Sequence, residues 1–174
     1  IGADEFVPAN PGSLSLSAAT YSGAENGGTI TLTLTRTGGS SGAVSTTVSY
    51  SGGSATGGTV CNPADYINLS SIASWADGDT VDKTVTVPIC DDAVFEGDET
   101  FNATLGTFTG GATGGATTSA VVTITENDPP PLPAISINDV AQAEGNSGTS
   151  LMTFTVSLSS PSGLTVTVNY ATTD

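Results

Sequence analysis

Residues 30–35 read Ile-Thr-Leu-Thr-Leu-Thr, so that apolar side chains alternate with threonine. Successive side chains of a β-strand point to opposite faces of its sheet, and this pattern therefore predicts a strand with one buried face. The same alternation occurs in residues 84–89, 101–105 and 120–124. We find no convincing stretch with the three-to-four-residue spacing of an amphipathic helix. The sequence thus predicts an all-β fold.

Glycine pairs separate the alternating runs, and such pairs favour turns between strands. We expect strands near residues 13–20, 28–37, 43–50, 66–75, 80–90, 98–108 and 118–125. Seven antiparallel strands arranged in two packed sheets form an immunoglobulin-like β-sandwich. Trp75 is the single tryptophan, and we expect it to cover the core of that sandwich.

A proline-rich run, Pro-Pro-Pro-Leu-Pro at 129–133, divides the chain. Proline cannot donate to a sheet and stiffens an extended chain, so this run predicts a linker. It would separate a domain at 13–128, preceded by an N-terminal extension at 1–12, from a second segment at 134–174.

The second segment repeats the start of the domain. Glu144 matches Glu25 and Tyr170 matches Tyr50, at offsets of 119 and 120 residues. About three strands are expected there, which cannot enclose a two-sheet core alone. We therefore expect a partial second sandwich. Either another copy of the protein completes it, by strand exchange in a head-to-tail filament, or the chain continues past Asp174.

The charge balance excludes several functions. The chain has 17 acidic and 2 basic residues, a net charge of -15, and no histidine. Nucleic-acid binding and attraction to anionic membranes both need basic side chains, and no apolar run approaches the roughly 20 residues of a membrane-spanning helix. Without histidine a Ser-His-Asp or Cys-His arrangement is impossible, and the few dispersed aromatic residues argue against a glycosidase groove. We expect no enzyme.

The acids gather at the ends of the expected strands, where Glu25, Asp65, Asp91, Asp92 and Asp128 lie. Alternate strand ends of a sandwich meet at one pole, so these carboxylates are expected to converge. Two unit charges about 4 Å apart repel by roughly 4 kcal/mol at an effective dielectric of about 20, so the loops need a cation. Hard oxygen ligands favour Ca²⁺, whereas Mg²⁺ demands a near-octahedral shell. The alternative is a negative surface that only maintains solubility.

The two cysteines, Cys61 and Cys90, predict a disulfide and an oxidising compartment, with two buried free thiols as the alternative. The lack of histidine and of a third cysteine argues against a zinc site. The chain does not begin with Met, and we expect that an upstream segment was removed, either a signal peptide or a trimmed end. We therefore expect an extracellular or cell-surface protein.

One motif points to a family. The run Val-Pro-Ile-Cys-Asp-Asp-Ala-Val-Phe-Glu-Gly-Asp-Glu-Thr-Phe at 87–101 resembles the signature of Calx-β domains, which are known from sodium/calcium exchangers, integrin β4 and bacterial surface proteins. The Asp65-Tyr66 pair, the Trp-Ala-Asp-Gly-Asp turn at 75–79 and the ending Val-Thr-Ile-Thr-Glu-Asn-Asp at 122–128 fit the same pattern in the same order. The resemblance covers the whole expected domain and part of the second segment.

Carried over by position, the resemblance implies calcium ligands at Glu25, Asp65, Asp91, Asp92, Glu96, Glu99 and Asp128, and at the carbonyl of Val94. Glu126 and Asn127 fill the other two places of the terminal triplet. Asn127 is neutral where an exchanger domain carries an acid, so we expect one to three calcium ions. A calcium-free member whose acids only cap loops is the alternative. A Cys61–Cys90 bridge would tie two ligand-bearing loops together.

These features favour an extracellular structural or adhesive module of a surface array or filament. Its expected partners are other copies of the protein or neighbouring repeats, with a surface ligand or a glycan in addition. A regulatory calcium sensor within a larger protein is the alternative. A sensor must be coupled to a second functional unit, and nothing in the sequence indicates one.

Overall fold

The computed structural model describes residues 8–173, so most of the expected extension at 1–12 lies outside the described residues. The chain forms two compact units, the first ending at Asp128 and the second beginning at Pro129. The helical segment described in the first unit is a single 3-10 turn, η1 (Glu25–Gly27). Within residues 8–173, no helix has the length and apolar character needed to cross a lipid bilayer.

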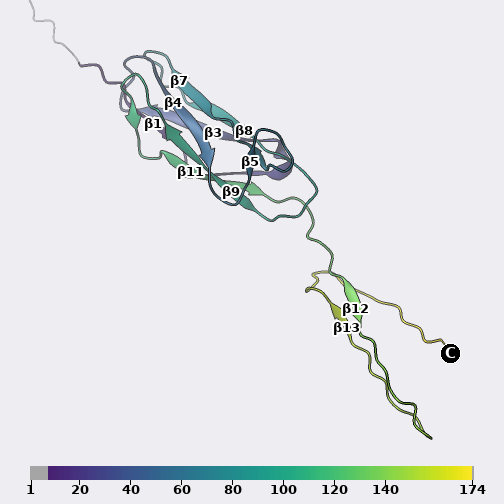
Figure 1. The fold of residues 1–174 in the computed structure, drawn as a ribbon. Coiled ribbons are helices and arrows are strands. Elements are labelled where there is room, and N and C mark those ends of the chain that lie inside the picture. Colours follow the sequence, from purple (N-terminus) through teal and green to yellow (C-terminus); the bar gives the residue numbers. More distant parts are fainter. Residues whose placement is uncertain (1–7, 174) are drawn as a thin grey trace, which may run out of the picture. The chain divides into compact units, whose positions relative to one another are not determined.

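The first unit is a two-sheet sandwich, as the alternating pattern predicts. One sheet has the order β10 (Thr113–Gly114), β1 (Ser13–Leu16), β3 (Thr29–Thr37) and β8 (Lys83–Pro88). The other has the order β2 (Thr20–Ala24), β11 (Ser119–Thr125), β9 (Glu99–Gly106), β4 (Val44–Ser51) and β7 (Ser71–Trp75). A short additional pair is formed by β5 (Gly57–Gly58) and β6 (Tyr66–Ile67). Figure 1 labels most strands of the first unit, among them β3, β9 and β11.

The structure corrects the expected strands at the sheet edges. The expected strand 13–20 breaks at residues 17–19, because β1 pairs with β3 while the chain then crosses to the other sheet, where β2 runs parallel to β11. The expected strand 66–75 separates into β6 and β7. Pairing is antiparallel in the sheet centres but parallel at β1–β10, β2–β11 and β5–β6. Alternation locates a strand without showing which sheet it joins.

The core lies between the two sheets and uses the apolar positions of the alternating runs. Ile30, Leu32 and Leu34 are buried along β3, while the threonines between them face outward. Trp75 is fully buried, and its indole Nε1 donates to the carbonyl of Val81 at 2.8 Å. A buried indole needs such an acceptor, so this bond fixes the turn that follows β7.

An aromatic cluster closes one end of the core. Tyr66 stacks on Phe101 with ring centroids 4.1 Å apart, and Tyr50 meets both rings edge-on. Asp65 precedes Tyr66, and Glu99 lies two residues before Phe101. Packing of these rings therefore fixes the backbone from which both carboxylates project.

The two basic side chains of the protein lie at the other end of the first unit. Arg36 is buried and donates to the backbone carbonyls of Pro11, Ser41, Gly42, Ala76 and Asp79 at 2.9–3.2 Å. Lys83, the first residue of β8, pairs with the carboxylate of Asp79 at 2.7 Å. Neither cation is free to neutralise acids at the far end of β3 and β8.

The second unit contains one antiparallel pair, β12 (Ile135–Ile137) with β13 (Val156–Leu158) (Figure 1). Of the roughly three strands expected in this segment, the structure forms these two, and residues 159–173 contain no strand. A groove in this unit is lined by apolar side chains that are at least two-fifths exposed, among them Ile135, Phe154, Val156, Val168 and Tyr170. A two-stranded sheet with no second sheet packed on it leaves this face uncovered within the unit.

Candidate metal centre

Strand register brings the acids of the first unit to one pole. The parallel pairing of β2 with β11 ends at Ala24 and Thr125, so Glu25 and Glu126 follow side by side. Glu99 is the first residue of β9 and pairs with the end of β11. The hydrogen-bond ladder of one sheet thus places three of the expected ligands together.

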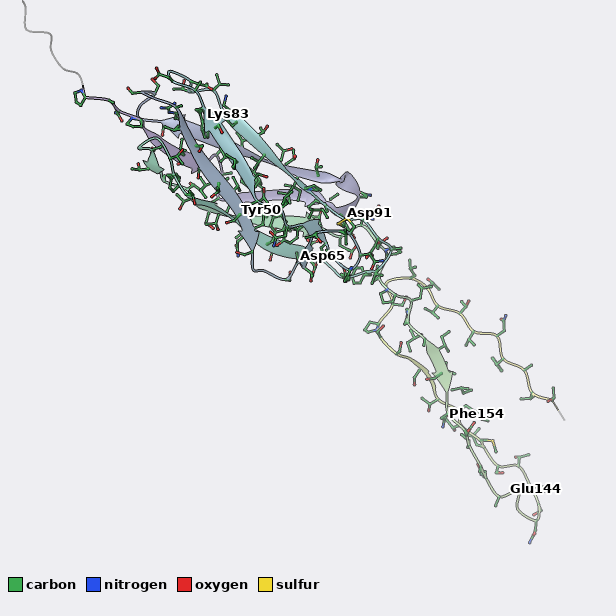
Figure 2. All side chains as sticks on the ribbon, turned by 45° about the horizontal axis from the view of Figure 1, so that its top comes forward. Tyr50, Asp65, Lys83, Asp91, Glu144 and Phe154 are labelled. Atoms are coloured by element: carbon green, nitrogen blue, oxygen red, sulfur yellow. A yellow bond between two sulfur atoms is a disulfide. The ribbon has the colours of Figure 1, made fainter. Side chains whose placement is uncertain are left out.

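The loop before β6 joins this pole through a covalent bond and a backbone bond. Cys61 and Cys90 form the predicted disulfide, with Cα atoms 5.4 Å apart. The amide of Cys90 also donates to the carbonyl of Asp65 at 2.9 Å. Figure 2 shows Asp65 and Asp91 at the same end of the first unit, with Lys83 toward the opposite end. The disulfide therefore links the two loops that carry these aspartates.

Six carboxylates form two groups, and within each group one oxygen from every residue lies within 4.8 Å of the others. One group contains Glu25, Glu126 and Asp128, and the other contains Asp65, Glu96 and Glu99. A small cavity of about 10 Å³ is lined by members of both groups, and it has the size of a single water molecule or ion. At such separations like charges repel one another, so the three carboxylates of each group oppose one another's ionisation.

The remaining expected ligands lie beside these groups rather than in them. Asp91 and Asp92 are exposed, and an oxygen of Asp92 accepts the amide of Val94 at 2.7 Å. The amide of Asp92 approaches Glu25 Oε1 at 3.4 Å, which holds this loop next to the first group. The Val94 side chain is exposed. Coordination by these three residues stays a prediction.

The environment opposes ionisation of most of the grouped carboxylates. Burial raises the pKa of Glu25 to about 6, and the nearby carboxylates of Glu126 and Asp128 add to this. Burial, followed by the adjacent carboxyl of Asp65, raises the pKa of Glu99 to about 7. The pKa values of Glu96 and Asp128 are also raised, first by burial and then by neighbouring acids. The grouped acids therefore lack a compensating positive charge.

Glu126 is the exception. Its Oε2 accepts the amides of Glu96 and Gly97 at 2.6 and 2.9 Å, and its Oε1 accepts those of Asn127 and Asp128 at 2.8 and 2.7 Å. These backbone bonds lower its pKa to about 2. Hydrogen bonds to a carboxylate stabilise its charged form, so Glu126 is ionised at every physiological pH.

The donor set fits a hard cation. Asp128 Oδ2 is buried and has no hydrogen-bond partner among the described residues, and a buried carboxylate oxygen without a partner is costly. The only ion pair among residues 8–173 joins Lys83 to Asp79, at the opposite end of β8. Carboxylate oxygens with neither histidine nor free thiol suit Ca²⁺ best among the common protein-bound metals.

Two polar residues of the pole were not among the expected ligands. Asp98 accepts the amide of Glu126 at 3.0 Å, and the side chain of Asn127 accepts the amide of Asn26 at 3.0 Å. Both bonds connect segments far apart in sequence. The position of Asp98 between Glu96 and Glu99 is visible in the sequence, but nothing there shows that it faces backbone rather than an ion.

The fold agrees with comparisons to known proteins. The Calx-beta domain model matches residues 8–128, and the chain belongs to that family. A comparison with curated protein sequences gives no match.

Solved structures with a similar fold include the calcium binding domain CBD12 of CALX1.1, at 25% identity and a TM-score of 0.59. That alignment covers 66% of this chain and 44% of the other, so this chain spans less than half the length of that protein. The apo-form Calx CBD1 domain is similar over 67% of this chain and 97% of its own, at 23% identity and a TM-score of 0.57. The alignment with the Calx CBD2 domain covers 68% of this chain and 88% of that domain, at 16% identity and a TM-score of 0.55. The two latter likenesses show the fold alone.

Proposed function

We propose that the first unit binds Ca²⁺ at its acidic pole and that the ion holds the strand-end loops together. The observation that carries this proposal is the convergence of six carboxylates, five of which line a small cavity, while Oδ2 of the sixth, Asp128, is buried and unpartnered among the described residues. A cation removes the mutual repulsion and supplies the missing partner at once. The similarity to a domain described as calcium binding supports the same choice of ion.

Glu25 and Asp128 are proposed to hold one ion, and Asp65, Glu96 and Glu99 a second. Asp91, Asp92 and the Val94 carbonyl are close enough in the chain to complete the six to eight oxygen ligands that Ca²⁺ takes. Two groups of acids support two ions, which lies within the expected range of one to three. Calcium would act as a structural cross-link, with no catalytic role.

Thermal unfolding tests the proposal. Calcium at a hundredfold excess over its Kd should stabilise the fold by about 2.7 kcal/mol relative to chelator, raising the Tm by roughly 10 °C. Asp128→Asn should remove much of this gain, whereas Asp82→Asn, an exposed aspartate near the opposite end of β8, serves as the matched control. Equal Tm values in chelator and in millimolar calcium would refute calcium binding by the fold.

We also propose that the protein works outside the cell as a structural or adhesive module. The Cys61–Cys90 disulfide supports an oxidising compartment, because cytosolic thiols are normally kept reduced. A regulatory calcium sensor is the second candidate, since the similar CBD12 of CALX1.1 is described as a calcium binding domain and a sensor would also need one. Small-angle scattering separates the two: a sensor changes its dimensions on calcium binding, whereas a structural module only becomes more rigid.

The second unit suggests how such a module assembles. Phe154, Val156 and Val168 are about half exposed within their unit, and Tyr170 is 93% exposed. Apolar surface costs roughly 25 cal/mol per Å² in water, so we propose that strands of a neighbouring repeat or of another copy cover this face. Light scattering of the 174-residue chain tests completion between copies. A monomer at all concentrations, with Tyr170 protected from solvent, would refute it.

A further inference from the structure

Glu126 differs from the other acids of the pole in what its oxygens already bind. Four backbone amides donate to its carboxylate, two to each oxygen, at 2.6–2.9 Å. An ionised carboxylate offers about four lone-pair positions, so these bonds fill its acceptor capacity. None of the other five grouped carboxylates accepts as many described bonds.

The four donors come from two separate parts of the chain. Glu96 and Gly97 lie in the loop between β8 and β9, while Asn127 and Asp128 follow β11. The same carboxylate therefore connects the backbones of two loops, and both loops carry proposed calcium ligands. Asp98 strengthens this connection by accepting the amide of Glu126 itself at 3.0 Å.

We propose that Glu126 is a positioning residue, which anchors the 96–97 loop to the end of β11 and so sets the spacing of the calcium ligands, instead of coordinating an ion. This inference rests on the proposed calcium function. Charged hydrogen bonds to backbone amides are strong, and an anchor formed before the ion arrives lowers the ordering cost of binding. The sequence pattern alone assigns this position a ligand role.

A matched pair of variants tests the proposal. Glu126→Gln replaces one acceptor oxygen by an NH₂ group that faces two amide donors, so in chelator its Tm should fall by at least about 5 °C. Glu99→Gln makes the same chemical change at a half-buried acid whose carboxylate accepts no described backbone amide, and its Tm in chelator should rise because repulsion is relieved. A ligand role for Glu126 predicts a rise for both variants.

Binding measurements at a temperature well below unfolding separate positioning from stability alone. For Glu126→Gln, calorimetric titration with Ca²⁺ should give a Kd about 10- to 100-fold weaker with an unchanged number of ions. Terbium luminescence should give an unchanged number of bound waters per ion. Loss of one ion or a gain of bound water would make Glu126 a ligand, and an unchanged Kd would make it only structural; either result overturns the proposal.

Amide hydrogen exchange of the wild-type protein tests the Glu126 anchor without a variant. In chelator, the amide protons of Glu96, Gly97, Asn127 and Asp128 should be protected relative to that of Val94, which bonds to exposed Asp92. Rapid exchange at all four would refute the anchor. Absence of calcium binding by the wild-type protein would instead refute the proposed function, and the exchange result would still test the anchor.

Discussion

Removal of the Cys61–Cys90 disulfide should destabilise the first unit strongly. The bond closes a loop with a sequence separation of 29 residues, which contains β6, β7 and β8. In the chain-entropy model, a loop of this length contributes about 3–4 kcal/mol by restricting the unfolded chain. Cys61 is exposed and Cys90 is buried, so Cys61→Ser with Cys90→Ala avoids placing a new hydroxyl in the interior. We expect the Tm to fall by roughly 10–15 °C.

The measurement should be made in chelator, so that calcium does not mask the loss. Urea unfolding of the double variant should show a lower midpoint together with a larger m-value, because an unfolded chain without the cross-link exposes more surface. Reductant should lower the stability of the wild-type protein to a similar extent and leave the variant unchanged. A wild-type and variant Tm that agree within about 3 °C would refute the entropic reasoning.

Three further results are expected from the same structure. In chelator, the Tm should fall as the pH rises from about 5 to about 8. The pKa values of Glu25 and Glu99 are raised in the folded state, to about 6 and about 7, from the ordinary value of 4.5. The folded state therefore holds protons that the unfolded state has already released, and a further rise in pH removes this stabilisation. A Tm that rises over this range would contradict it, and saturating calcium should reverse the trend. Arg36→Met should cost at least about 3 kcal/mol in urea unfolding, because five backbone carbonyls lose a buried charged donor, and a cost below about 1 kcal/mol would contradict this. Phe101→Ala should cost about 3–5 kcal/mol by the same assay, since it removes the partner of the Tyr66 ring, and a loss below about 1 kcal/mol would show that the cluster collapses into the space.

The sandwich could be predicted because period-two alternation has a direct physical cause. Ile30, Leu32 and Leu34 are buried as the pattern requires, and the sheet centres pair as expected. The crossing of the chain from β1 to β2 could not be predicted, because both strands alternate in the same way whichever sheet they join. The parallel pairing of β2 with β11 depends on contacts about a hundred residues apart, for which a local pattern carries no information.

The candidate site shows a similar division. The gathering of acids at strand ends follows from strand positions, and the structure brings six of them into two groups. Asp91 and Asp92 lie beside the groups, in the loop between β8 and β9. Residue type can fix the geometry of a short turn, but this loop is longer, so the sequence did not show where its side chains lie. The difference between Glu126 and Glu99 could not be predicted, because it depends on which backbone amides face each carboxylate.

The pole is held by connections of three kinds, and each joins different segments. The disulfide joins the loop before β6 to the end of β8, and Glu126 joins the β8–β9 loop to the end of β11. The hydrogen bond from the backbone amide of Asn26 to the side chain of Asn127 joins η1 to the end of β11. These links hold the segments that carry the two groups, and within each group the carboxylates lie within 4.8 Å of one another with their charges uncompensated. Because the links do not depend on an ion, calcium binding would neutralise a site that is already assembled, and it should change stability and local motion more than backbone position.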